Sequence, residues 1–66
     1  MKITVNGVTT NVFAGTTIAT FIAERGLHSK AVVVEHNYDI IKQEQLNTVI
    51  LKTDDNLEIV TFVGGG

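Results

Sequence analysis

The chain has no cysteine, no proline and no tryptophan, and its 66 residues include only five lysines and arginines. The lack of cysteine excludes disulfide bonds and a thiol nucleophile on this chain, and it fits a reducing compartment. The basic residues are spread along the sequence and the net charge is −2, which argues against a nucleic-acid-binding protein. Two scattered histidines do not form a metal-binding motif, so we expect no metal site.

Long apolar runs are also missing from the sequence. No run approaches the roughly 18 residues of a membrane span, and the first residues alternate at strand period instead of forming a signal peptide. With 44% apolar residues, a chain of 66 residues has room for one hydrophobic core and no second. These properties predict one small soluble domain, which we expect in the cytoplasm.

The start of the chain carries the pattern of a β-hairpin. Residues 2–6 and 8–13 alternate at strand period, and the Asn6-Gly7 pair between them is typical of a type I′ turn. We interpret Asn6-Gly7 as a structural turn and little else.

A short helix is predicted next. In residues 17–25 apolar positions recur at the spacing of one helix face, and either Thr16 or Thr17 can cap its start. Gly26 is a natural stop, because a helix commonly ends with a residue in the left-handed region. A helix this short is unstable alone, so we expect it to lie on a sheet.

Strand patterns in the second half are shorter and less regular. Residues 31–35 are almost continuously apolar, which predicts a strand covered on most of both faces. Residues 40–41 fit a short edge strand, and residues 49–51 fit either a turn packed on the core or another strand. Residues 53–56 predict a turn, and residues 57–63 alternate as a last strand.

The polar residues between these elements show no pattern of a catalytic or metal site. We expect His28 and His36 to be surface or loop histidines. Asp54 and Asp55 lack the spacing of a calcium loop, which predicts a solvated turn in which Asp54 can adopt left-handed geometry.

The order of the predicted elements points to one architecture. A β-hairpin, a helix, a strand, a short strand and a last strand require the helix to cross between the second and third strands. The helix then covers one face of a mixed sheet. We therefore predict an α+β fold of the β-grasp (ubiquitin-like) type, with a mixed four- to five-stranded sheet and one helix packed across one face.

The whole chain resembles the ThiS group of β-grasp sulfur carriers, which serve the thiazole branch of thiamin biosynthesis. The matching segments are MKITVNG at 1–7, TIATFI at 17–22, VVVEHN at 32–37, II at 40–41 and LEIV at 57–60. The specific part is a last strand that runs to a C-terminal Gly-Gly in a short chain. The chain departs from the family pattern mainly in loops, at Tyr38, Lys42, Gln43 and Asp54.

The glycine-rich end divides the chain into two parts. We expect residues 1–63 to form the β-grasp domain and residues 64–66 to form a flexible C-terminal tail of three glycines. These glycines add no side-chain packing, so their function, if they have one, lies outside the domain. Without side chains, they could also enter a channel too narrow for other residues.

The resemblance implies a specific chemistry at Gly66. An adenylating enzyme of the ThiF type would use ATP to activate the Gly66 carboxylate, and a persulfide sulfur donor would convert it to a thiocarboxylate. A thiazole synthase of the ThiG type would then receive the sulfur. The chain is thus expected to be a protein co-substrate with no bound cofactor, and not an enzyme.

Strand parity indicates where a partner would dock. If Leu57 and Ile59 face the helix, alternate residues of the last strand lie on the uncovered sheet face. Large apolar side chains on that face, beside the tail, are suited to partner binding unless a loop residue covers them. The expected partner-binding residues are Glu58, Val60, Phe62, Gly64 and Gly65.

Three alternatives to the thiamin carrier stay open at this point. The chain could carry sulfur for molybdopterin or another sulfur-containing metabolite, with the same tail chemistry. It could be a ubiquitin-like modifier that forms an isopeptide through Gly66. It could also be a non-covalent β-grasp binding module with an inert tail.

Overall fold

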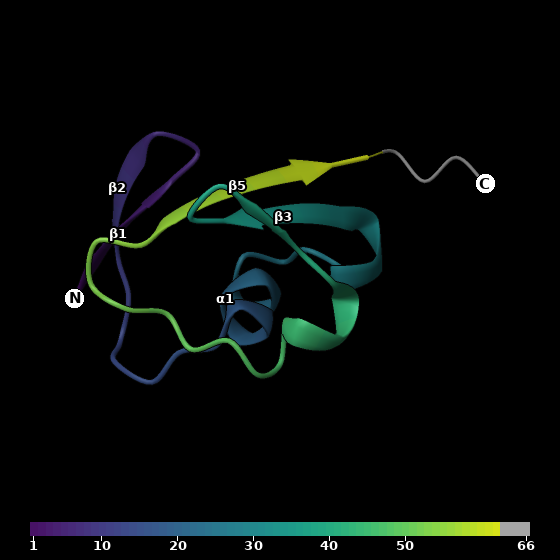
Figure 1. The fold of residues 1–66 in the computed structure, drawn as a ribbon. Helices are drawn as coiled ribbons and strands as arrows, with labels where there is room; N and C mark the ends of the chain where they lie inside the picture. Colours follow the sequence, from purple (N-terminus) through teal and green to yellow (C-terminus); the bar gives the residue numbers. More distant parts are fainter. Residues whose placement is uncertain (63–66) are drawn as a thin grey trace.

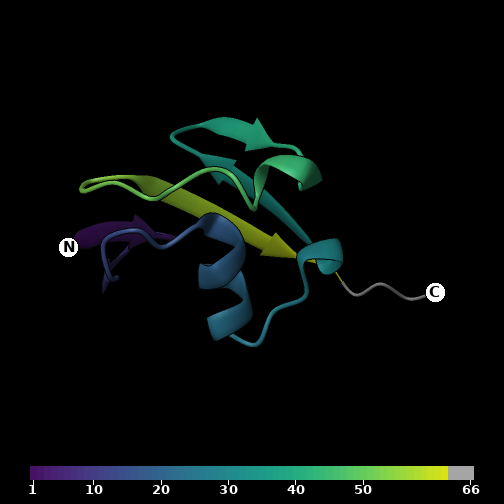
Figure 2. The ribbon, with the colours of Figure 1, turned by 90° about the horizontal axis from the view of Figure 1, so that it is seen from below.

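A computed structural model describes residues 1–62 of the chain and shows one sheet with one helix against one of its faces (Figures 1 and 2). The other sheet face is not covered by the helix, and we call it the open face. The elements in chain order are β1 (Lys2–Val5), β2 (Val8–Asn11), α1 (Ile18–Glu24), η1 (Ser29–Ala31), β3 (Val32–His36), β4 (Asp39–Ile41), η2 (Gln43–Gln45) and β5 (Asn56–Thr61).

The five strands lie in the order β2-β1-β5-β3-β4. The β1–β5 pair is parallel, and the other three pairs are antiparallel. The predicted mixed sheet of the β-grasp type is therefore confirmed. Strand β5, the last strand within residues 1–62, lies in the centre of the sheet (Figure 1).

The predicted hairpin is present, with a shorter second strand than expected. Asn6 and Gly7 both have positive φ, 49° and 82°, as a type I′ turn requires. Strand β2 ends at Asn11 and not at residue 13. The reason is that its partner β1 starts at Lys2, so only Met1 remains to pair with Val12, whose N–H donates to the Met1 carbonyl at 2.8 Å.

Helix α1 spans seven residues between the predicted caps. The Thr17 hydroxyl accepts a hydrogen bond from the Thr20 N–H at 3.1 Å, so Thr17 is the N-cap. At the other end, Gly26 has φ 74° and the Leu27 N–H donates to the Ile22 carbonyl at 3.1 Å, as in a Schellman stop. No helix within residues 1–62 is long and apolar enough to cross a bilayer.

The hydrophobic core fills the space between α1 and the sheet. Helix α1 contributes three buried side chains, and the strands contribute alternate residues. The loop between β4 and β5 closes the core, because Leu46 and Leu51 are both buried. The core side chains are those of Ile3, Val5, Ile18, Phe21, Ile22, Val32, Val34, Leu46, Leu51, Leu57 and Ile59.

Residues 31–35 and 49–51 differ from, or decide between, the structures expected from the sequence. The prediction that residues 31–35 are covered on most of both faces is wrong, because Val33 is 43% exposed. The described residues contain one α-helix, and that helix covers only the other face. Residues 49–51 form a single antiparallel bridge, Thr17 with Ile50, and Leu51 packs into the core. This segment is therefore not a full strand.

Replacing Leu57 by alanine tests the role of β5 in the core. Leu57 is fully buried, so Leu57→Ala should lower the free energy of unfolding by about 3–5 kcal/mol in urea titrations followed by circular dichroism. The matched control is Val60→Ala on the open face of the same strand, which should cost less than about 1 kcal/mol. Equal losses in the two variants would contradict this assignment of the two faces.

Candidate functional site

The candidate site begins with strand β5, the last strand of the described residues. Strand β5 pairs with β1 on one side and with β3 on the other, the latter over five residue pairs. The Phe62 N–H donates to the Ala31 carbonyl at 3.1 Å, so the pairing reaches the last described residue. Gly64, Gly65 and Gly66 lie outside the described residues, and their predicted roles and the boundary after residue 63 stay predictions.

Strand β5 and Phe62 directly after it carry, on the open face, the three side chains expected from strand parity. Leu57 and Ile59 are buried toward the helix, whereas Glu58 is half-buried on the other side. Val60 is 61% exposed and Phe62 is 49% exposed. The parity prediction for these five residues is confirmed, and Val60 and Phe62 form an apolar patch at the end of β5.

Leu46 does not cover this patch. Its side chain belongs to the core, and its carbonyl accepts a hydrogen bond from the Ala19 N–H of helix α1 at 2.8 Å. Leu46 therefore lies on the helix side of the sheet. The patch is instead extended by strand β3, where Val33 faces Val60 directly in the antiparallel pair.

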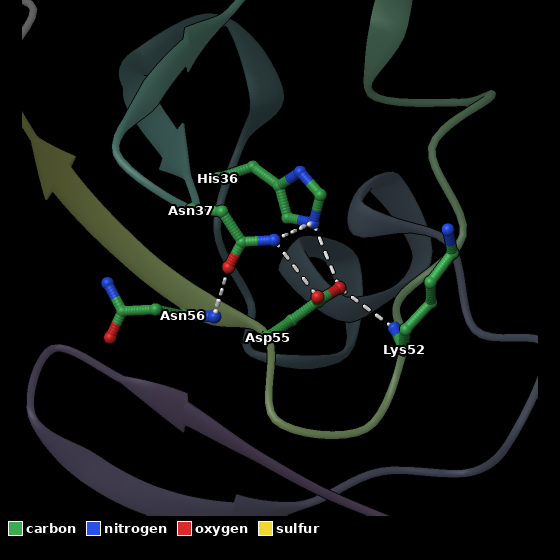
Figure 3. A network of polar contacts seen from close by, with 5 residues as sticks. All are labelled: His36, Asn37, Lys52, Asp55 and Asn56. Carbon is green, nitrogen blue, oxygen red and sulfur yellow. Dashed lines mark hydrogen bonds and ion pairs between the residues drawn. The ribbon is translucent and has the colours of Figure 1, made fainter.

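A network of polar side chains surrounds the start of β5 (Figure 3). Its centre is the carboxylate of Asp55, which is only 6% exposed. This carboxylate accepts three hydrogen bonds: from His36 Nε2 at 2.9 Å, from Asn37 Nδ2 at 3.0 Å and from the Lys52 N–H at 2.8 Å. A buried carboxylate with this many donors is suited to remain ionised.

The pKa of Asp55 follows from two opposed effects. Burial raises it, but the hydrogen bonds from His36, Asn37 and the Lys52 backbone outweigh burial and hold the pKa below its ordinary value. Because an ionised carboxylate only accepts hydrogen bonds, His36 must carry its proton on Nε2. The two donors, His36 Nε2 and Asn37 Nδ2, lie 3.5 Å apart and converge on the same carboxylate.

Asn37 connects this network to the backbone of β5. The side-chain Oδ1 of Asn37 accepts a hydrogen bond from the Asn56 N–H at 2.8 Å, and the backbone N–H of Asn37 donates one to the Asn56 carbonyl at 2.8 Å. Asn37 and Tyr38 form the turn between β3 and β4, and both have positive φ, 51° and 74°. The network therefore holds the β3–β4 turn against the first residue of β5.

Asn6 performs a similar role on the other side of β5. Its Oδ1 accepts from the Ile59 N–H at 2.7 Å, and its Nδ2 donates to the Ile59 carbonyl at 3.2 Å. These bonds continue the parallel pairing beyond Val5, where β1 ends. The interpretation of Asn6-Gly7 as little more than a turn is thus incomplete, because the Asn6 side chain also holds β5 in place.

Residue patterns in the sequence did not reveal this network. The predictions of a loop or surface position for His36 and of a solvated Asp55 are wrong, whereas His28 is exposed as expected. Asp54 has φ 70°, so its predicted left-handed geometry is confirmed. Strand parity contained a signal, because His36 continues the inward positions of Val32 and Val34, and Asp55 precedes Leu57 by two residues.

In chemical terms, the described residues offer an exposed apolar patch at the end of a strand that is paired on both sides. His36 and Asp55 are engaged in hydrogen bonds that connect parts of the fold. Within residues 1–62, no three side chains of the metal-ligating types gather at one point.

Comparison with known families assigns the chain to one of them. The model of the ThiS family matches residues 3–66, which is nearly the whole sequence. The chain belongs to the ThiS family. The resemblance of the sequence to the ThiS group is therefore confirmed.

The chain is similar to three proteins of different length. The sulfur carrier protein ThiS of Bacillus subtilis is 46% identical over 50 residues, which cover 76% of each chain. The thiazole synthases of Paramagnetospirillum magneticum and Magnetococcus marinus are each 38% identical over all 66 residues of this chain. The chain spans only 20% of the length of these two thiazole synthases.

Two solved structures have the same fold as this chain. The crystal structure of the thiamine biosynthesis protein ThiS from Geobacter metallireducens has a TM-score of 0.84 at 26% identity and covers both chains completely. A solution structure of a thiamine biosynthesis protein from that organism has a TM-score of 0.80 at 26% identity and covers all of this chain and 88% of the other.

Replacing Asp55 by asparagine tests the polar network. At pH 7 the substitution Asp55→Asn should lower the free energy of unfolding by about 2–4 kcal/mol, because His36, Asn37 and the Lys52 N–H lose a charged hydrogen-bond acceptor. The wild-type contribution is present above the ordinary carboxyl pKa and is lost as pH falls below about 4, because the folded pKa is lowered.

Urea unfolding between pH 7 and pH 2 measures both effects, and the variant should show a smaller loss of stability on acidification than the wild type. Asp54→Asn is the matched control, because Asp54 is exposed in the same turn and asparagine tolerates its φ. If both variants lose the same small amount of stability, the network does not hold β5.

Proposed function

We propose that this chain is the sulfur carrier of thiamin biosynthesis, with the sulfur bound at the Gly66 carboxylate. The observation that carries the proposal is the ThiS family match, which extends through the glycines to residue 66. The 46% identity to the sulfur carrier protein of Bacillus subtilis supports it. The chain then acts as a protein co-substrate and not as an enzyme, and we place it in the cytoplasm.

The proposed chemistry follows from the properties of a carboxylate. The C-terminal carboxylate has a reference pKa of about 3.5, so it is ionised at neutral pH and has no leaving group. An adenylating enzyme of the ThiF type supplies one: the carboxylate attacks ATP, pyrophosphate leaves, and an acyl-adenylate forms at Gly66. Attack by a persulfide sulfur displaces AMP, and reduction of the resulting acyl disulfide by a thiol leaves the thiocarboxylate.

The proposed sulfur acceptor is a thiazole synthase of the ThiG type. Two proteins named thiazole synthase contain, in one fifth of their length, a region that is 38% identical to this whole chain. A carrier and a thiazole synthase within one polypeptide are suited to successive steps. In this chain, Gly64 and Gly65 have no side chains, so they let Gly66 enter a narrow active site.

We further propose that the partner docks on the patch beside the tail. Val60 and Phe62 supply exposed apolar area, and Glu58 lies next to them on the same strand face. Apolar side chains with polar neighbours are typical of binding surfaces. Because β5 is held on both sides, docking there fixes the position of Phe62, the last described residue, relative to the partner.

The intact mass of the chain tests the carrier function. After incubation with ATP, the adenylating enzyme of the same organism, a persulfide source and a thiol, the mass should increase by the difference between sulfur and oxygen. Fragmentation should locate the change at Gly66. A chain without Gly65 and Gly66 should show no increase. No change in the full chain with an active adenylating enzyme, or isopeptide conjugates instead, would contradict the proposal.

Substitution of Val60 and Phe62 tests the docking patch. The double variant Val60→Ser/Phe62→Ser should bind the thiazole synthase of the same organism about 10- to 100-fold more weakly in calorimetric titrations, because buried apolar contacts dominate such interfaces. The control is Val8→Ser/Ile50→Ser, which removes two exposed apolar side chains from outside the open-face patch. Equal affinity of the two double variants would argue against the patch.

A further inference from the structure

Two glutamates face each other at the centre of the open face. Glu35 of β3 and Glu58 of β5 are directly opposite residues in the antiparallel pair, and both are half-buried. Directly opposite residues on one sheet face have Cβ atoms about 5 Å apart, and like charges in such a pair destabilise the sheet. An isolated domain gains nothing in stability from this arrangement.

No basic side chain of the described residues compensates the pair. Within residues 1–62, the one ion pair at 4.0 Å or less joins His36 to Asp55, on the helix-facing side of the same strands. Glu35 and Glu58 therefore have no cationic partner in this part of the chain. The position between them is suited to a cation from another molecule.

Exposed apolar side chains border the two glutamates. Val33 and Val60 form the next residue pair on this face, and they are 43% and 61% exposed. On the other side of Glu35, strand β4 presents Ile40, which is 69% exposed and directly opposite. A binding partner that covered these side chains would also remove water from the glutamates and strengthen any charge contact there.

We propose that the open face binds an arginine of the thiazole synthase, held between Glu35 and Glu58 and surrounded by apolar contacts. A guanidinium has five donors in a planar fork and can bond two carboxylates at once, which an ammonium does less well. The inference rests on the proposed function and extends the docking surface from β5 across β3 to β4. Thiazole synthase is the chosen partner because two such proteins contain a region similar to this chain.

Calorimetric titration of the full chain with the thiazole synthase of the same organism tests the inference. Glu35→Gln/Glu58→Gln should bind about 10- to 100-fold more weakly, and its affinity should lose most of its dependence on salt between 50 and 500 mM NaCl, because salt screens charge contacts. Its melting temperature should equal or exceed that of the wild type, because the repulsion is removed.

The control variant Glu24→Gln/Glu44→Gln removes the same charge from α1 and η2, which lie on the helix side of the sheet (Figures 1 and 2). It should bind within about threefold of the wild type. If both double variants bound the thiazole synthase equally weakly, the loss of affinity would come from net charge alone, and the inference would be overturned. Wild-type affinity of Glu35→Gln/Glu58→Gln, or a loss of affinity confined to the adenylating enzyme, would also overturn it.

The mass measurement described above separates this inference from the carrier function. If the chain gains sulfur at Gly66 and Glu35→Gln/Glu58→Gln binds the thiazole synthase as the wild type does, the inference fails and the carrier function stands. If the wild type gains no sulfur, the carrier function fails. Absence of any binding between the wild-type chain and the thiazole synthase overturns the inference directly.

Discussion

The pairing of β5 with both of its neighbours is the constraint on which the rest of this structure depends. Residues at the two ends of the described chain meet there, because β1 and β5 are parallel neighbours in the middle of the sheet. The buried side chains of Leu57 and Ile59 hold β5 to the core, and its alternate residues form the open face. The core and the exposed apolar patch thus share one strand.

Side chains from two turns complete the position of β5. Asn37, through Asp55 and Asn56, holds the start of the strand, and Asn6 bonds to the backbone of Ile59 further along. Both asparagines also have positive φ in their own turns, which asparagine tolerates better than most residues. Each therefore combines a turn conformation with a contact to a strand distant in sequence.

Local patterns were enough to predict much of the fold and the exposed side of the candidate site. The Asn6-Gly7 turn, the Thr17 cap and the Gly26 stop depend on neighbouring residues, so their sequence signals are strong. The polar network was missed because His36 and Asp55 are 19 residues apart, and neither gives a motif by itself.

The exposure of Val33 was missed for a different reason. A continuous apolar run is compatible with a strand buried on two faces or with one that presents an apolar side chain for binding. Only the number of layers in the fold separates the two cases, and that number is a property of the whole chain. The same argument applies to Glu35 and Glu58, which become neighbours only once the register of β3 and β5 is known.

The parallel arrangement of β1 and β5 has a mechanical consequence. A force that pulls the start of β1 away from the end of β5 acts along both strands in opposite directions, so it loads their hydrogen bonds in shear. The bonds from Thr4 to Asp55, from Asn6 to Leu57 and from Ile59 to the Asn6 side chain must then yield together. A hairpin pulled at its open end yields one bond at a time instead. A partner that pulls on the chain beyond β5 therefore meets resistance in this direction from the central strands of the sheet.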